Sequence, residues 1–261
     1  MIEDKTFLDL RLADNEQDIL GAQRLRYRVF VEELGGDGPD VDHRARLERD
    51  EFDPHADHLI LVDPRRSPET LDHVVGVYRL LTGERAQHAG GFYSEREFDL
   101  AALKASGKSL LELGRSCVDR NHRGGLALFT LWNGLAEYVR FRKADVLFGV
   151  ASFHGTDPAP LSEPLSYLHH HHLADPELRP VAIGPDRRPM NVLPVGQVGR
   201  RAALRVIPPL IKAYLRIGGQ VGDGAFADRA FNTTDVCMVV DTARISPRQR
   251  TLYSSAGAAD A

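Results

Sequence analysis

The segment spanning residues 111–127 constrains the fold of this chain more than any other part of it. It begins as an apolar strand that carries one acid and one base, Glu112 and Arg115. It then passes through the glycine pair Gly124-Gly125 into an apolar helix. A strand that leads through a glycine turn into a helix is where backbone N–H groups can bind a phosphate. The pattern predicts an α/β protein with an anion-binding turn beside two reactive side chains. The alternative is an ordinary strand-to-helix turn.

Two kinds of apolar periodicity alternate along the chain. Alternating or continuous apolar runs predict strands, and apolar residues at helical spacing predict helices. The predicted strands cover residues 6–12, 58–63, 73–81, 110–118, 145–153 and 236–241, and the predicted helices cover residues 16–34, 95–104, 125–142, 161–173 and 208–217. This order favours an α/β sheet with helices on both faces.

The length and the cysteine content indicate the class and compartment of the protein. The chain has 261 residues, 43% of them hydrophobic, and no long linker, so residues 1–245 are predicted to form one domain followed by a frayed tail at 246–261. Its two cysteines, Cys117 and Cys237, are typical of a reducing cytoplasm. We see neither a signal peptide nor the run of about 20 apolar residues that spans a bilayer. A cytoplasmic protein is predicted.

Charge is distributed unevenly, although the net charge of −4 argues against nucleic acid as a partner. Residues 32–63 contain eleven acids and three bases, whereas residues 200–216 contain five bases and no acid. The acidic segment could line a pocket for a cationic substrate. The basic segment could bind an acidic protein or the surface of the inner membrane. The alternative is two ordinary solvated faces.

Four charged residues upstream of the glycine turn are candidates for a substrate pocket. Glu48, Asp50 and Asp53 could converge on an ammonium group, the alternative being a solvated acidic loop. Arg79 lies late in an apolar strand, where a buried charge needs a ligand or an ion-pair partner. These four residues are candidates for a pocket that binds an ammonium group, and the resemblances described below imply that the substrate is an amino acid.

Glu112 and Arg115 are the candidate catalytic pair. Residues three apart point to opposite faces of a regular strand, so the two share a site only if a bulge intervenes. If the reaction requires removal of a proton from the substrate, Glu112 is the candidate general base. No covalent intermediate is needed, so Cys117 is predicted to be a packed core residue.

The order of these residues resembles that of the acyl-homoserine-lactone synthases. That family carries an Arg and a Phe in its first helix, then Glu-x-Asp-x-x-Asp, Arg-Leu and Glu-x-x-Arg. The matching residues are Arg24, Phe30, Glu48, Asp50, Asp53, Arg79, Leu80, Glu112 and Arg115. The family's Trp after the first helix is missing, since the single Trp of this chain is Trp132. S-adenosylmethionine is therefore not expected as a substrate.

The glycine turn resembles the pyrophosphate-binding signature of the GCN5-related N-acetyltransferases (GNAT enzymes), with His122 in place of Gln or Arg. The resemblance implies a GNAT-like mixed sheet flanked by helices, in which the turn binds the pantetheine arm of an acyl thioester. The donor-binding residues that it implies are Val118, His122, Arg123, Gly124, Gly125 and Ala127.

A resemblance over nearly the whole chain is to the bacterial ornithine-lipid-forming N-acyltransferases, on residues 26–33, 151–158, 208–216, 222–225 and 231–236. Those enzymes transfer a 3-hydroxyacyl chain from acyl carrier protein to the α-amine of ornithine, giving a lyso-ornithine lipid. The resemblance implies a donor-binding core at about 58–158 and a C-terminal extension of helices and strands at 159–245. It also implies carrier protein and an amino acid as partners, the carrier's phosphopantetheine thioester as co-substrate, and neither cofactor nor metal.

Alternatives stay open at this point. A homoserine-lactone-type signal synthase and a non-catalytic lipid- or carrier-binding protein are the other two hypotheses, and glutamine, lysine and glycine are alternative head groups. The histidines at 169–172 are predicted to be structural rather than metal ligands, because adjacent side chains on a helix point in different directions.

Overall fold

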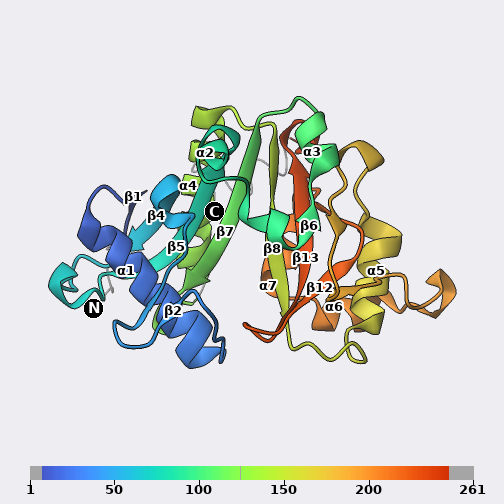
Figure 1. The fold of residues 1–261 in the computed structure, drawn as a ribbon, viewed down its shortest axis with the longest axis horizontal. Coiled ribbons are helices and arrows are strands. Elements are labelled where there is room, and N and C mark those ends of the chain that lie inside the picture. Colours follow the sequence, from blue (N-terminus) through green and yellow to red (C-terminus); the bar gives the residue numbers. More distant parts are fainter. Residues whose placement is uncertain (1–7, 124, 247–261) are drawn as a thin grey trace, which may run out of the picture. The chain divides into compact units, whose positions relative to one another are not determined.

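The structure is a computed structural model that describes residues 8–123 and 125–246 (Figure 1). This part of the chain forms two compact units. The first unit comprises residues 8–81 and 113–142, and the second comprises residues 82–112 and 143–246. Strand β7 (Leu110–Val118) contributes residues to both units, so Glu112 belongs to the second unit and Arg115 to the first.

The first unit contains a sheet with the strand order β1 (Asp9–Leu12), β4 (Asp57–Val62), β5 (Val74–Thr82) and β7. β1 and β5 both pair antiparallel with β4. Nearly every residue of β4 and β5 is buried, as in strands that are covered on both faces. A separate hairpin pairs β2 (Val41–Asp42) with β3 (Leu47–Glu48).

Two helices cover the opposite faces of this sheet. The helix α1 (Glu16–Arg26) packs on the face of β4 that carries Ile60, in a core cluster with Ala22 and Leu25. The helix α4 (Gly125–Arg142) packs on the other face, where a Cβ atom added at Gly76 would lie 2.9 Å from the side chain of Leu131. Gly76 pairs with Leu61, the neighbour of Ile60, and successive strand residues point to opposite faces.

The helix α1 continues without a break into a π-helix over Tyr27–Glu33. The wider turn is visible in its hydrogen bonds, because the N–H of Leu34 donates to the carbonyl of Val29, five residues earlier, at 3.1 Å. Gly35 then ends the helical segment with a φ of 76°, a left-handed conformation that glycine adopts without steric cost.

The second unit is built on a long antiparallel pair. β8 (Val146–His154) and β13 (Thr233–Asp241) are in register along their whole lengths, and the first three residues of β7 pair parallel with β8. β12 (Ala225–Asp228) and β11 (Gln220–Val221) pair with β13, and β10 (Arg187–Arg188) pairs with β12. β6 (Phe98–Asp99) and β9 (Val181–Ala182) form a two-stranded sheet of their own.

Short helices surround these strands. The α-helices of the second unit are α2 (Gly83–His88), α3 (Ala101–Ala105), α5 (Ser162–His172), α6 (Arg200–Val206) and α7 (Pro209–Arg216). The 3-10 turns of the two units are Asp53–His55, Pro68–Thr70, Tyr93–Arg96, Arg120–His122, Pro176–Leu178, Val195–Gln197 and Thr242–Arg244. Within the described residues, none of the helices has both the length and the apolar character that crossing a membrane requires.

The predicted fold class, a mixed α/β sheet flanked by helices, is confirmed. β7 and α4 have the predicted bounds, and the other predicted strands agree within a few residues. The helix predicted over 95–104 is wrong. That segment is a 3-10 turn, strand β6 and helix α3, because Phe98 and Asp99 pair with β9, and Asp99 then accepts a hydrogen bond from the N–H of Ala101 at 2.8 Å in the turn before α3. Residues 1–7 and most of the predicted tail lie outside the described residues.

The buried carboxylate of Asp18 links three elements of the first unit. It accepts hydrogen bonds from Arg11 of β1 at 2.9 Å and from Asn15, the N-cap of α1, at 3.1 Å. It also lies 3.2 Å from a ring nitrogen of His73, the residue before β5. Burial by itself would raise the pKa of Asp18, yet Arg11 foremost, together with the backbone N–H of Asp14 and with His73, lowers it from 3.8 to about 2.

Replacing Asp18 with Asn is expected to cost about 2 kcal/mol of unfolding free energy at pH 6, the equivalent of this pKa shift. Because the folded-state pKa is lowered, the contribution is complete above pH 4 and is lost as the pH falls towards 2. The wild-type and variant curves should therefore converge near pH 2 in urea titrations. Asp14→Asn is the matched control, since Asp14 is exposed and lies 3.7 Å from Arg11. A difference between Asp18→Asn and wild type that persists at pH 2 would show that the charge of Asp18 is not the cause.

Candidate active site

A buried network of acids and arginines occupies the first unit. Arg26, the last residue of α1, is fully buried. It binds both Glu48, in β3, and Asp53, in the 3-10 turn after β3. The distance from Nη1 of Arg26 to Oδ1 of Asp53 is 2.7 Å. Asp53 also accepts a hydrogen bond from Gln23 at 2.9 Å. One helix face thereby fixes two of the three predicted acids.

Two strand arginines complete the network. Arg79 of β5 lies 2.5 Å from Asp50 and 2.9 Å from Asp53. Arg115 of β7 lies 2.9 Å from Glu48 and 3.0 Å from Asp50. The structure therefore brings together five of the six residues predicted to bind the amino acid or to act in catalysis, and it joins each acid to two arginines.

Three acids and three arginines leave this network electrically balanced. Burial by itself would raise the pKa of Asp53, but the guanidinium groups of Arg26 and Arg79 hold it well below its ordinary value. The pKa of Asp50 is likewise lowered by Arg79 and Arg115 against the effect of burial. Asp50 and Asp53 are therefore ionised at neutral pH, and each lies against two arginines.

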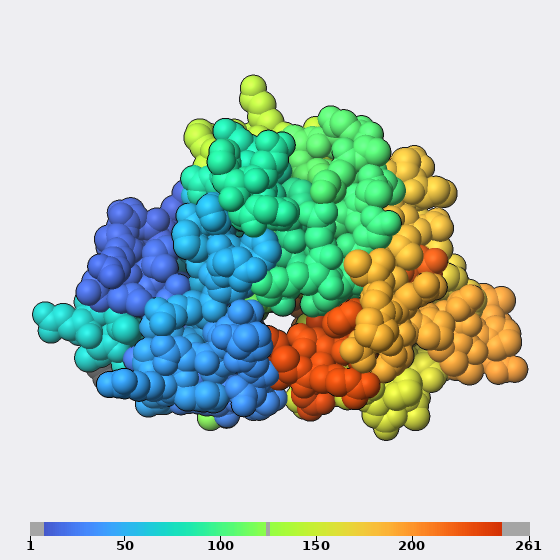
Figure 2. All heavy atoms as spheres, in the orientation of Figure 1, coloured from blue at the N-terminus to red at the C-terminus, as the bar shows by residue number. Residues whose placement is uncertain are grey.

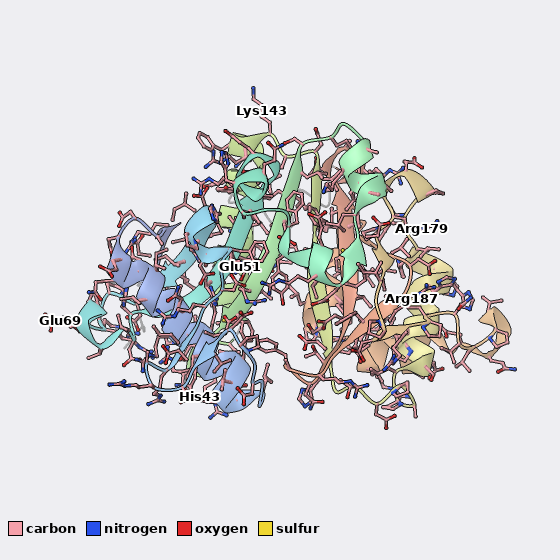
Figure 3. All side chains as sticks on the ribbon, viewed as in Figure 1. His43, Glu51, Glu69, Lys143, Arg179 and Arg187 are labelled. Atoms are coloured by element: carbon pink, nitrogen blue, oxygen red, sulfur yellow. The ribbon has the colours of Figure 1, made fainter. Side chains whose placement is uncertain are left out.

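The solvent boundary of the network lies close by. Glu51, marked in Figure 3, is exposed, although its neighbours Asp50 and Phe52 have buried side chains. The guanidinium of Arg79 lies 5.7 Å from the ring centroid of Phe52, a cation–π contact. Asp40 lies 3.6 Å from Arg115 at the same edge.

Sequence reasoning missed Arg26. The resemblance pointed to Arg24, which is half-buried and donates to the backbone carbonyl of Ala45 at 2.9 Å. The signal that identifies Arg26 is the helical period: Ala22, Leu25 and Val29 are buried apolar residues, and position 26 lies on the same face. A charge on that face must meet partners inside the unit, and Arg26 does so.

The backbone of β7 is irregular at Arg115. Its φ is 49°, a left-handed value that is uncommon for a residue with a side chain and that breaks the regular alternation of β7. Strand β7 therefore departs from regular strand geometry at Arg115, as it would at a β-bulge. Arg115 turns to Glu48 and Asp50 of its own unit.

Glu112 is buried in the second unit and its carboxylate has a fixed orientation. The N–H of Tyr93 donates to one oxygen at 2.9 Å, and the N–H and hydroxyl of Ser94 donate to the other at 2.7 and 2.5 Å. These donors lie at the first turn of the 3-10 helix Tyr93–Arg96, whose orphan N–H groups suit an anion. They hold the carboxylate in one orientation and so set the direction in which it can accept a further proton.

The predicted donor turn lies where β7 ends and α4 begins, at Gly125. His122 lies 3.0 Å from Asp119 and 3.6 Å from Asp63, so a carboxylate stands near each ring nitrogen. Arg123 donates to the carbonyl of Val118 at 3.1 Å and forms a two-pronged ion pair with Glu33, one contact of which measures 2.7 Å.

These contacts limit which groups of the turn could bind the phosphate of an acyl donor. The side chains of His122 and Arg123 are held by carboxylates of the first unit, so the backbone N–H groups at the start of α4 are the better candidates for binding a phosphate. Ala127 is buried in the first turn of α4, as a close helix–strand contact requires. Gly124 lies outside the described residues.

The two cysteines have no features of a nucleophile. Both are free and buried, and burial raises the pKa of Cys117 to about 12 and that of Cys237 well above its ordinary value. A thiol with such a pKa is protonated at neutral pH. Cys117 packs in the core cluster of the first unit.

Among the described residues, two groups of carboxylates are close enough to share a cation, with oxygens within 4.8 Å of one another. In the first group, Asp40, Glu48 and Asp50, the guanidinium of Arg115 already supplies the positive charge. The second group lies in the second unit and consists of Glu97, Asp228 and Asp235. Carboxylate oxygens of this kind are ligands for hard cations such as Ca²⁺ and Mg²⁺.

Comparisons with known proteins identify the class first. Residues 25–133, which include the acid–arginine network and the glycine turn, match the acetyltransferase (GNAT) domain. The fold is similar to that of FeeM, an N-acyl amino acid synthase from uncultured soil microbes (TM-score 0.54, 11% identity, 96% of this chain and 97% of that one). It is also similar to that of the acyl-homoserine-lactone synthase LasI (TM-score 0.50, 14% identity, 94% of both chains).

Curated relatives then identify the family. The chain is 56% identical to the L-ornithine N(alpha)-acyltransferase of Rhodobacter capsulatus over 94% of both chains. It is 40% identical to the enzyme of the same name from Brucella abortus, over 95% of this chain and 89% of that one. The chain therefore belongs to the L-ornithine N(alpha)-acyltransferase family and is an acyltransferase with a GNAT-type fold.

Proposed function

We propose that this enzyme transfers a 3-hydroxyacyl group from acyl carrier protein to the α-amine of L-ornithine, giving a lyso-ornithine lipid. Ornithine is proposed as the acceptor of the acyl group because the chain is 56% identical, over 94% of both chains, to a relative named L-ornithine N(alpha)-acyltransferase. The acyl group and its carrier rest on the sequence resemblance described above. The free, buried state of both cysteines is consistent with a reducing cytoplasm, where we place the reaction.

The reaction needs a deprotonated amine aligned with a thioester. Once the α-ammonium group has lost one proton, its nitrogen attacks the acyl carbon, the carbon–sulfur bond breaks, and a second proton from the nitrogen ends on the carrier thiol. We propose that Glu112 accepts the first of these protons, from the α-ammonium group, because its carboxylate is buried and its direction is fixed by three hydrogen-bond donors. Positioned proton acceptors contribute on the order of 10²–10⁴-fold to rate.

The acid–arginine network would serve binding of the amino acid. We propose that Glu48, Asp50 and Asp53 hold Arg79 and Arg115 in place, and that these arginines orient the carboxylate of ornithine. A guanidinium binds a carboxylate through two parallel hydrogen bonds, which fixes the position of the adjacent α-amine. The short contacts of Arg79 and Arg115 to the acids support this role.

The donor would bind at the turn between β7 and α4. We propose that the backbone at Gly124 and Gly125 binds the phosphopantetheine arm, with Val118 and Ala127 beside it. In this role His122 and Arg123 shape the turn through Asp119 and Glu33. No separate cofactor and no metal is needed for this chemistry, since the thioester itself is the activated group.

The test is thiol release from 3-hydroxyacyl carrier protein, and separately from the matching coenzyme A thioester, with ornithine, lysine, glutamine or glycine as acceptor. We expect release with the carrier and ornithine, together with an amide product of the corresponding mass. A lactone product would instead favour a signal synthase. Binding of carrier without thiol release, for every amino acid, would favour a non-catalytic protein.

A further inference from the structure

The surface around α6 in the second unit combines exposed apolar side chains with unpaired arginines. Val192, Val195 and Val206 expose 49%, 59% and 47% of their surface, values that are high for branched apolar residues. The arginines of the same segment, Arg200, Arg201 and Arg205, are exposed as well. We call these six residues the α6 surface. Orange atoms, from the part of the chain near residue 200, form part of the visible surface of the second unit in Figure 2.

The charge of this surface is of one sign. Between Asp186 and Asp223 the sequence contains seven bases and no acid, in a chain whose net charge is −4. No carboxylate of the described residues lies within 4.0 Å of Arg200, Arg201 or Arg205. Some exposed arginines elsewhere are paired, for example Arg49 with Asp42 at 3.0 Å.

The inner side of the same segment is fixed to the unit. Ala203 and Ile207 are almost completely buried, and α6 packs against α5. The N–H of Gly199, the N-cap of α6, donates to Glu163 of α5 at 2.8 Å. The helix is therefore held by its buried face, and the arginines and valines are the part of it that remains at the surface.

We propose that the α6 surface binds the anionic surface of a lipid bilayer. At the headgroup boundary the valine side chains would move from water into the acyl region, and the arginines would bind lipid phosphates, as in peripheral amphipathic segments. Protein–protein interfaces depend instead on aromatic anchors, and valine is rare among their energetic centres. The mixture of exposed valine and unpaired arginine therefore favours lipid over an acidic protein.

A second basic and apolar position supplies the matched control. Phe141, at the end of α4 in the first unit, is 77% exposed and is flanked by the exposed Arg140 and Lys143. Acids are close there, since Arg142 pairs with Asp57 at 2.8 Å. A double charge reversal at positions 140 and 143 changes the net charge by the same amount as one on α6.

The proposal goes beyond the proposed reaction and is tested without any substrate. The full chain is sedimented with vesicles of phosphatidylglycerol and phosphatidylcholine in equal parts, and with vesicles of phosphatidylcholine alone. We expect binding to the anionic vesicles that weakens as salt is raised. Arg201→Glu with Arg205→Glu should weaken it by about 25-fold or more, because each basic residue near such a surface contributes about fivefold.

Two further variants separate the contributions of charge and apolar contact. Val192→Ser with Val195→Ser should weaken binding and leave its salt dependence in place, and Arg140→Glu with Lys143→Glu should bind as wild type does. Thermal melts identify variants that fail to fold. The proposal is overturned if the wild type does not bind anionic vesicles, or if the control pair abolishes binding. It is also overturned if the α6 pair loses binding of acyl carrier protein while vesicle binding is unchanged.

Discussion

Replacing Glu112 with Gln is expected to lower kcat by 10²–10⁴-fold, the range for loss of a positioned proton acceptor. At the same time the amide N–H₂ of Gln cannot accept a hydrogen bond, so one of the donors at Tyr93 and Ser94 would lose its partner. A purely structural role would therefore also produce a loss. The pH profile separates the two roles, because an α-amine with a pKa of about 8 loses its own proton as the pH rises. The variant should recover activity from pH 7 to pH 9 more steeply than wild type.

Ser94→Ala is the matched control for this experiment. It removes the hydroxyl that donates to Glu112 at 2.5 Å and leaves the carboxylate and both backbone donors in place. We expect a smaller loss of kcat and a pH profile parallel to that of wild type. Near wild-type turnover in a folded Glu112→Gln enzyme would exclude Glu112 from proton transfer.

Replacing Arg26 with Met is expected to lower the free energy of unfolding by about 3–5 kcal/mol, the usual cost of removing one partner from a buried ion pair. Glu48 and Asp53 would keep their charges inside the first unit, with only Arg115 and Arg79 to neutralise them. For a chain of this size the melting temperature should fall by roughly 10 °C. Thermal and urea unfolding measure the effect.

Arg24→Met tests the same kind of substitution one half-turn away on the same helix. Arg24 is only half-buried and donates to a single backbone carbonyl, so its loss should cost about 1 kcal/mol. Equal destabilisation by the two substitutions would contradict the claim that Arg26 neutralises the buried Glu48 and Asp53. Activity of the Arg26→Met variant, measured below its melting temperature, should show a raised KM for the amino acid, because Arg79 and Arg115 lose the supports that position them.

Much of the fold follows from local pattern. β7 and α4 have strong apolar periodicity and a glycine turn between them, and their bounds agree with the sequence prediction. The π-helix over Tyr27–Glu33 could not be predicted in this way, because its apolar residues suit a continuing α-helix equally well. The helix predicted at 95–104 failed for a related reason. Phe98 is buried by pairing with the distant β9, a tertiary contact that overrides local propensity.

The candidate site was predictable in composition but less so in its contacts. The sequence identified the acids, Arg79 and Arg115, whose charges had to find partners once their strands were buried. It did not show that those partners would be one another, since pairing across more than 60 residues, as between Glu48 and Arg115, depends on the completed sheet. The donors to Glu112 were also missed. Two of them are backbone N–H groups, which nearly every residue has, so the sequence does not show which of them bind a side chain.

The most direct test of the central claim is the position of the amide bond formed from L-ornithine. Purified enzyme, 3-hydroxyacyl carrier protein and L-ornithine are incubated together, and the product is fragmented by tandem mass spectrometry. The account predicts one acyl group on the α-nitrogen and one equivalent of free carrier thiol for each product molecule. Acylation of the δ-nitrogen, or no amide from ornithine while another amino acid is acylated, would contradict it.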